Sequence, residues 1–239
     1  MHHTYLIFMK NNAQPFALIF DMDGTLINSN PTHKEAFEQF FAKHNIEMTD
    51  EDFVNYVSGR MNPDIMKHFF GDDISSQKIN ALTREKESIF QELFEPKLKP
   101  IKGLMPFLKK AKEKDIPMAL ATSAPKMNID FVFEHIPLGE YFPHLVHDTD
   151  VKEGKPAPEV FQKAARKLGF PPERCIVFED SKAGVEAAQA AGMKVVVLTT
   201  THTADELKGA DWVIDDFTEV TITKLGKLVP EKEKVVFSK

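Results

Sequence analysis

Cysteine is almost absent from this chain of 239 residues, and long hydrophobic runs are missing altogether. The one cysteine, Cys175, cannot form an intramolecular disulfide or a multi-thiolate metal site, which favours a reducing compartment. No apolar run approaches the ~20 residues that span a bilayer, so we expect no membrane partner. Basic residues number 30 against 36 acidic ones, so the chain lacks the broad positive field of nucleic-acid-binding proteins, and we expect no nucleic-acid partner.

Internal repeats and low-complexity segments are also lacking, whereas 42% of the residues are hydrophobic and 20 are phenylalanine. This composition excludes disorder, and the length predicts one large domain or a core with an insert. Residues 1–14 are interpreted as a loose leader with Met9 as a candidate start, because the cationic start of a secretory signal is absent. We therefore expect the protein to be cytoplasmic. We also expect a monomer, with a dimer as the alternative.

Four apolar runs are typical of buried parallel strands, because they lack the alternation of a strand with one solvated face. They cover residues 16–20, 117–122, 175–178 and 194–198. Amphipathic helical stretches alternate with the later runs, at residues 104–114, 159–169 and 182–192. Alternation of strands and helices predicts an α/β fold, a doubly wound parallel sheet covered by helices on both faces.

About 90 residues separate the first two predicted strands, although one crossover helix would suffice. This span contains helical patterns only, at residues 31–45, 49–59, 62–70 and 75–94. The first begins with Pro31 and places Phe37, Phe40 and Phe41 on one face. The pattern predicts a catalytic core of residues 1–28 and 97–239, with a smaller α-helical domain inserted at 29–96.

Polar side chains follow the predicted strands at the point where each strand ends. Asp21 and Asp23 follow the first strand, Ser123 follows the second, and Glu179 and Asp180 follow the third, while Lys155 precedes a helix. Because the carboxyl ends of parallel strands meet at one edge, where ligands bind, we expect these groups to converge.

The chemistry of these groups is complementary. The carboxylates of Asp21, Glu179 and Asp180 supply hard oxygen ligands suited to Mg²⁺. Asp21 is then a candidate nucleophile and Asp23 a candidate acid and base, with Ser123 and Lys155 holding a phosphoryl group. The alternative for the Asp-x-Asp pair alone is a capped turn at a strand end.

Four segments resemble the motifs of the haloacid dehalogenase superfamily, and most closely its β-phosphoglucomutase-like phosphatase branch. They are FDMDGTL (20–26), ATS (121–123), KPAPEVF (155–161) and VFEDSKAGVEAAQAAGM (177–193). The resemblance implies a Rossmann-like core with a helical cap and an aspartyl-phosphate intermediate on Asp21. It also implies Mg²⁺ held by Asp21, the Asp23 backbone carbonyl and Asp180, with Glu179 nearby. Further phosphate or substrate contacts are expected from Gly24, Thr122, Ala124, His33, Arg60, Lys86 and Asn128.

Substrate choice is expected to come from the cap, because the core is shared by all members of such a superfamily. His33 is expected to fix the acid–base Asp23, as in the mutase branch, and the alternative is an exposed histidine at a helix start. Arg60 resembles a phosphate-binding arginine of a cap loop, although an ordinary surface arginine fits equally well. Lys86 and Arg84 lie in a strongly charged helix, where a solvated face is the favoured interpretation.

Together these features predict a Mg²⁺-dependent phosphatase acting on a small phosphorylated metabolite such as a sugar phosphate. The first alternative is a β-phosphoglucomutase-type hexose-phosphate mutase, which the hinge sequence at residues 25–29 disfavours. Pyrophosphate or phosphonate hydrolysis is a further alternative. A phosphate sensor without catalysis would be expected to have lost Asp21, Asp23 or Lys155, and none is lost.

Overall fold

Residues 15–230 are described by the computed structural model, so the leader expected at 1–14 lies outside the described residues. At its centre is a six-stranded parallel sheet with the strand order β3-β2-β1-β4-β5-β6. The strands are β1 (Ala17–Phe20), β2 (Met118–Ala121), β3 (His144–Val146), β4 (Cys175–Glu179), β5 (Lys194–Leu198) and β6 (Trp212–Ile214). This is the Rossmann-like, doubly wound α/β fold expected from the sequence.

The two edge strands, β3 and β6, were not predicted. Each is three residues long and only partly buried, so neither forms the apolar run that marks the inner strands. The inner strands are buried at almost every position, which is the pattern of a sheet covered on both faces.

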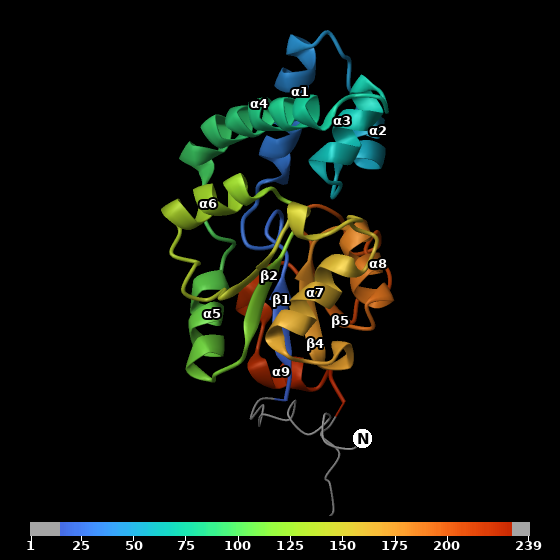
Figure 1. Ribbon diagram of the computed structural model, residues 1–239. Coiled ribbons are helices and arrows are strands. Elements are labelled where there is room, and N and C mark those ends of the chain that lie inside the picture. The colour runs from blue at the N-terminus through green and yellow to red at the C-terminus, as the bar shows by residue number, and fades with distance from the viewer. Residues whose placement is uncertain (1–14, 231–239) are drawn as a thin grey trace, which may run out of the picture.

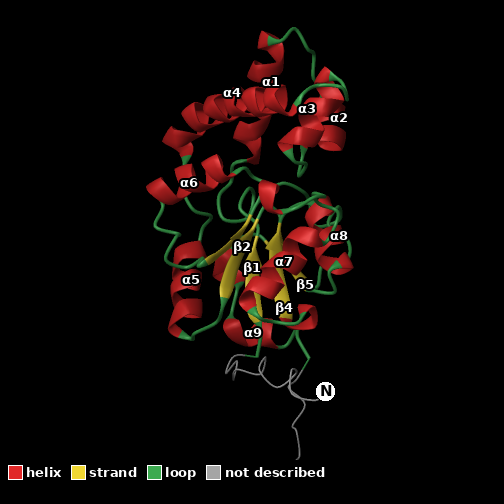
Figure 2. Cartoon of the chain, viewed as in Figure 1, coloured by secondary structure: helices red, strands yellow, loops and turns green. Residues whose placement is uncertain are grey.

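Helices cover both faces of the sheet (Figure 2). On one face, Leu18 and Phe20 pack with α5 (Leu104–Glu113), α6 (Lys126–His135) and α9 (Ile222–Gly226). On the other face, Ala17 and Ile19 pack with α7 (Glu159–Leu168) and α8 (Lys182–Ala190). Alternate residues of one strand thus enter two separate hydrophobic cores, as the pleat of a strand requires.

Of the α-helices between β1 and β2 in sequence, the first four gather beyond the carboxyl edge of the sheet (Figure 1). They are α1 (Asn30–Lys43), α2 (Asp50–Asp52), α3 (Asn62–Phe70) and α4 (Ser76–Phe94), and all fall within the predicted helical insert. Phe37, Phe40 and Phe41 are buried on one face of α1, as predicted. Short 3₁₀ turns occupy Glu95–Lys97, Asp148–Asp150, Pro172–Arg174 and Phe217–Glu219.

The segment predicted as one helix over residues 49–59 divides into two parts. Thr49 caps α2 through a reciprocal capping box with Asp52, but Phe53–Val57 then forms a π-helix that ends as Ser58 N–H donates to the Phe53 carbonyl. The wider turn places Phe53 and Val57 against the pocket described below. None of the helices within residues 15–230 has the length and apolarity to cross a membrane.

Candidate active site

A pocket lies between the carboxyl edge of the sheet and the inserted helices α1, α3 and α4. The strand order reverses at β1, whose neighbours β2 and β4 connect in opposite directions, and such a switch point opens a ligand-binding crevice. The pocket brings together most of the residues expected from the sequence. Among those lining it are Asp21, Asp23, His33, Arg60, Lys86, Thr122, Ser123, Ala124, Asn128, Lys155, Glu179 and Asp180.

Lys155 joins the carboxylates that follow β1 and end β4. Its ammonium donates to Asp21 Oδ1 at 2.6 Å and to Glu179 Oε1, and all three side chains are buried. Burial alone would lower the pKa of Lys155, but the charges of Asp21 and Glu179 outweigh burial and raise it. Lys155 therefore carries a full positive charge beside the candidate nucleophile.

Glu179 is anchored by more donors than Lys155 alone. Its Oε2 accepts from the backbone N–H groups of Asp180 and Ser181, both at 2.8 Å, and from Ser181 Oγ at 2.9 Å. Burial opposes the charged form, yet Lys155 and these hydrogen bonds lower the pKa of Glu179. Gly184 of α8 leaves the room for this carboxylate, since a Cβ there would lie 1.9 Å from it.

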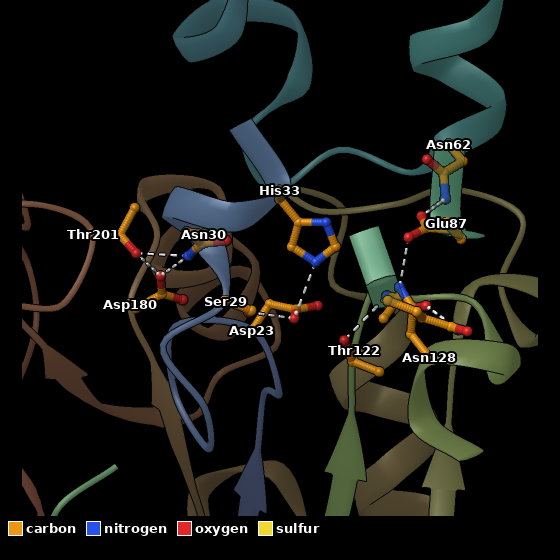
Figure 3. A network of polar contacts seen from close by, with 12 residues as sticks. Asp23, Ser29, Asn30, His33, Asn62, Glu87, Thr122, Asn128, Asp180 and Thr201 are labelled. Atoms are coloured by element: carbon orange, nitrogen blue, oxygen red, sulfur yellow. Dashed lines mark hydrogen bonds and ion pairs between the residues drawn. The ribbon is translucent and has the colours of Figure 1, made fainter. Parts of the chain in front are cut away.

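Asp180 is held by two residues that the sequence analysis missed. Asn30 Nδ2 donates to Asp180 Oδ2 at 2.9 Å and to Thr201 Oγ1 at 2.7 Å, and Thr201 also donates to Asp180 Oδ2 (Figure 3). Gly24, with φ of +76°, packs behind this carboxylate, because a Cβ there would meet Asp180 Oδ2 at 2.0 Å. Gly24 thus makes room for Asp180. A substrate contact was expected from Gly24, but this residue is not among those that line the pocket.

Asp21, Glu179 and Asp180 form a cluster that can hold a cation, with one ligand atom from each lying within 4.8 Å of the others. Burial raises the pKa of Asp21 to about 7, and burial with the neighbouring carboxylates raises the pKa of Asp180. Within residues 15–230, no hydrogen bond reaches Asp21 Oδ2 or Asp180 Oδ1. Such a set of unshared hard oxygens fits Mg²⁺, whose charge would relieve the repulsion.

Asp23 occupies a separate polar environment. Its Oδ1 accepts from Ser29 Oγ at 2.5 Å and lies 3.3 Å from His33 Nε2 (Figure 3). Burial would raise the pKa of Asp23, but His33 and Ser29 outweigh burial and lower it. The two aspartates of the motif therefore differ in pKa, which is typical of carboxylates with different catalytic roles.

The segment that follows β2 also lines the pocket. Thr122 Oγ1 accepts from the Ala124 N–H at 3.1 Å, which fixes the turn, and Ser123 Oγ lies 3.5 Å from the Gly59 carbonyl of the cap. Asn128, at the start of α6, is completely buried, and both polar atoms of its side chain contact residues of α4. In this conformation Asn128 joins the cap to the sheet domain.

The segment between β1 and β2 contributes one exposed and one buried cation to the pocket. Arg60 is exposed and lines the pocket, and its side chain has no ion-pair partner among the described residues. The solvated interpretation of Lys86 is wrong, because this side chain is 2% exposed and contacts His33 and Glu87, whereas Arg84 is exposed as expected. The burial of Lys86 could not be predicted from the charged pattern of the helix, because the two preceding residues are more exposed.

Comparison with known proteins agrees with this geometry. The family model of haloacid dehalogenase-like hydrolases matches residues 18–198, which include β2 to β5, all of β1 except Ala17, and every residue that lines the pocket. The chain belongs to this hydrolase family. It is 30% identical over 222 residues to the protein CbbY of Rhodobacter capsulatus, covering 89% of this chain and 98% of the relative.

Two further relatives carry names that describe ligands. A phosphorylated carbohydrates phosphatase of Thermotoga maritima is 35% identical over 182 residues, covering 74% of this chain and 82% of the relative. A crystal structure of CbbY from Rhodobacter sphaeroides in complex with xylulose 1,5-bisphosphate superposes with a TM-score of 0.77 and 27% identity. That match covers 89% of this chain and 99% of the other.

Proposed function

We propose that this hydrolase is a Mg²⁺-dependent phosphatase that acts on a small sugar phosphate through a phosphorylated Asp21. The observation that carries the proposal is the arrangement around Asp21, which directly follows β1. One of its oxygens is bound by Lys155, and the other accepts no hydrogen bond within residues 15–230. Relatives named as phosphatases, one of them for phosphorylated carbohydrates, support the substrate class.

In the first step, a carboxylate oxygen of Asp21 attacks the phosphorus while the bond from phosphorus to the sugar oxygen breaks. Asp23 protonates that leaving oxygen, and Lys155 stabilises the phosphoryl oxygens as their charge changes. Ser123 lies on the pocket wall beside these groups and binds a third phosphoryl oxygen.

In the second step, water attacks the phosphorus of the aspartyl phosphate and Asp21 leaves as a carboxylate. Asp23, now ionised, takes the proton from the water, which returns both aspartates to their initial states. The lowered pKa of Asp23 keeps its carboxylate ionised once the proton has passed to the leaving group.

Mg²⁺ would be held by Asp21, Asp180 and the Asp23 backbone carbonyl, with Glu179 nearby. When bound, the ion supplies positive charge that keeps Asp21 ionised and partly neutralises the phosphoryl group. Glu179 contributes mainly by fixing Lys155, because its own oxygens already accept four hydrogen bonds.

Residues 29–96 form a cap in this proposal, and residues 1–28 and 97–239 form the catalytic core. The cap encloses the pocket and supplies His33, Arg60 and Lys86, so its closure excludes bulk water from the phosphoryl group. Arg60, exposed at the rim, is placed to bind a polar group of the substrate.

A panel of sugar phosphates tests the proposal, with phosphate release and isomer formation measured in the same reactions. A phosphatase releases phosphate from at least one sugar phosphate in the presence of Mg²⁺ and not after chelation by EDTA. A mutase would instead convert β-glucose 1-phosphate to glucose 6-phosphate with little phosphate release. Absence of both activities would contradict catalysis and favour a phosphate sensor.

A further inference from the structure

A fully buried carboxylate, Glu87 of α4, lies at the junction of the cap and the core. Its side chain is 1% exposed and accepts three hydrogen bonds from three helices. Oε1 accepts from Lys86 Nζ at 2.8 Å. Oε1 also accepts from Asn62 Nδ2 at 2.7 Å, and Oε2 accepts from Asn128 Nδ2 at 2.8 Å (Figure 3). A buried charge with this many partners is costly to assemble, so its contacts call for an explanation beyond stability.

Lys86 connects this carboxylate to His33. The ammonium lies 3.0 Å from His33 Nδ1 and 4.2 Å from the centre of the Phe37 ring. Because an ammonium can only donate, His33 Nδ1 must accept, and the ring proton resides on Nε2. The His33 ring stacks on Phe90 with centroids 3.7 Å apart, which fixes the plane in which Nε2 points.

His33 in turn orients the acid–base carboxyl. Its Nε2–H faces Asp23 Oδ1 at 3.3 Å, and Ser29 Oγ donates to the same oxygen. Asp23 Oδ2 has no hydrogen-bond partner within residues 15–230, so a proton carried by this carboxyl resides on Oδ2. That oxygen is therefore the one presented to a leaving group.

The contact between Glu87 and Asn128 requires that the cap lies on the core. Asn128 belongs to α6, which follows β2, and both polar atoms of its amide are bound by α4. Its Nδ2 donates to Glu87, and its Oδ1 accepts from Gln91 Nε2 at 3.0 Å. Glu87 and Gln91 are four residues apart and share one face of the helix, so they hold Asn128 only when α4 is seated on α6.

We propose that Glu87 is a positioning residue that couples the seating of α4 on α6 to the orientation of Asp23, acting through Lys86 and His33. The inference rests on the proposed function, because it requires Asp23 to protonate a leaving group. Lys86 is 2% exposed and needs a negative neighbour to remain beside His33, and Glu87 supplies it. Separation of the cap would remove Asn128 from Glu87 and loosen Lys86, which would leave His33 no longer fixed beside Asp23.

The experiment compares two substrates of nearly equal shape, p-nitrophenyl phosphate and phenyl phosphate. Phenolate is the poorer leaving group, so hydrolysis of phenyl phosphate needs the proton from Asp23 far more. Glu87→Gln is expected to lower kcat for phenyl phosphate about tenfold or more, which is part of the roughly 10²–10⁴-fold effect of general acid–base catalysis, and to change p-nitrophenyl phosphate turnover much less. A purely structural role would lower both rates equally.

Three variants complete the experiment. Asp23→Asn is the reference and should show the same selectivity with a larger loss. Asn128→Ala removes the hydrogen bond to Glu87 without changing Lys86, and it should show the same selectivity with a smaller loss. This variant keeps the test decisive if Glu87→Gln does not fold. Glu92→Gln is the matched control, because Glu92 is exposed on the same helix, and both rates should match the wild type.

Two outcomes would overturn the inference, and they can be distinguished. If Asp23→Asn is selective but Glu87→Gln and Asn128→Ala lower both rates equally, Glu87 does not position Asp23, and the proposed function stands. If Asp23→Asn itself lowers both rates equally, the acid role of Asp23 fails and the inference fails with it.

Discussion

Replacing Gly184 by alanine isolates the importance of the buried carboxylate at the end of β4. Gly184 lies inside α8, where alanine is the better helix former by about 1 kcal/mol, so local propensity predicts a more stable protein. The new Cβ, however, would lie 1.9 Å from both Cδ and Oε1 of Glu179. These atoms cannot move freely, because Lys155, Ser181 and two backbone N–H groups hold them.

The expected loss of stability can be estimated from the buried ion pair that the new Cβ would disrupt. Displacing Glu179 separates it from buried Lys155, and disrupting a buried ion pair costs roughly 3–5 kcal/mol. Subtracting the gain in helix propensity leaves a net loss of about 2–4 kcal/mol in the free energy of unfolding. For a chain of this size, that loss corresponds to a fall in melting temperature of about 5–15 °C.

Urea denaturation and thermal melting of the metal-free protein measure this loss, and kcat should fall with it because Lys155 loses its fixed position. Gly226→Ala is the matched control, since its Cβ would meet only Phe16, at an ordinary 3.5 Å, and its stability should equal or exceed that of the wild type. Wild-type stability and turnover in Gly184→Ala would refute the reasoning.

Three other outcomes follow from the site. Lys155→Met is expected to lower kcat about 10²-fold or more for every phosphate ester tested, because its ammonium contacts the group that all share, and loss on one substrate only would contradict this. Arg60→Ala is expected to raise KM for a sugar phosphate several-fold and to leave p-nitrophenyl phosphate hydrolysis nearly unchanged, as steady-state kinetics on both substrates will show. Mg²⁺ is expected to raise the melting temperature more at about pH 8 than at about pH 5.5. The pKa values of Asp21 (about 7) and Asp180 are raised, so these two groups contribute stability that is lost as pH rises above about 4, and they must release protons before the ion binds. Equal shifts at the two pH values would contradict the assignment.

The sheet and the catalytic edge could be predicted from the sequence because both depend on local patterns. Runs such as residues 194–198 are buried on both faces and therefore entirely apolar, and the residues that follow each run meet at one edge. The edge strands β3 and β6 escaped prediction because three half-buried residues form no such run.

The supporting residues could not be predicted, because their roles depend on contacts between distant segments. Asn30 and Thr201 are separated by 171 positions, yet they contact each other and both bind Asp180. Lys86 and Glu87 lie in a helix with many charges, and only the packing of α4 on α6 shows which of them are buried. Ser29 was the most accessible of the missed residues, since it lies two positions before the first predicted helical stretch at residue 31. Its hydroxyl, however, binds Asp23 and does not cap the helix.

The central claim, a covalent phosphoryl group on Asp21, can be tested by rapid acid quenching of the enzyme during turnover of a substrate, followed by peptide mass spectrometry. The account predicts one added phosphoryl group on the peptide that contains Asp21, and no such peptide in a folded but inactive Asp21→Asn variant. Full turnover with no phosphorylated peptide at any quench time, or a phosphoryl group on another residue, would contradict it.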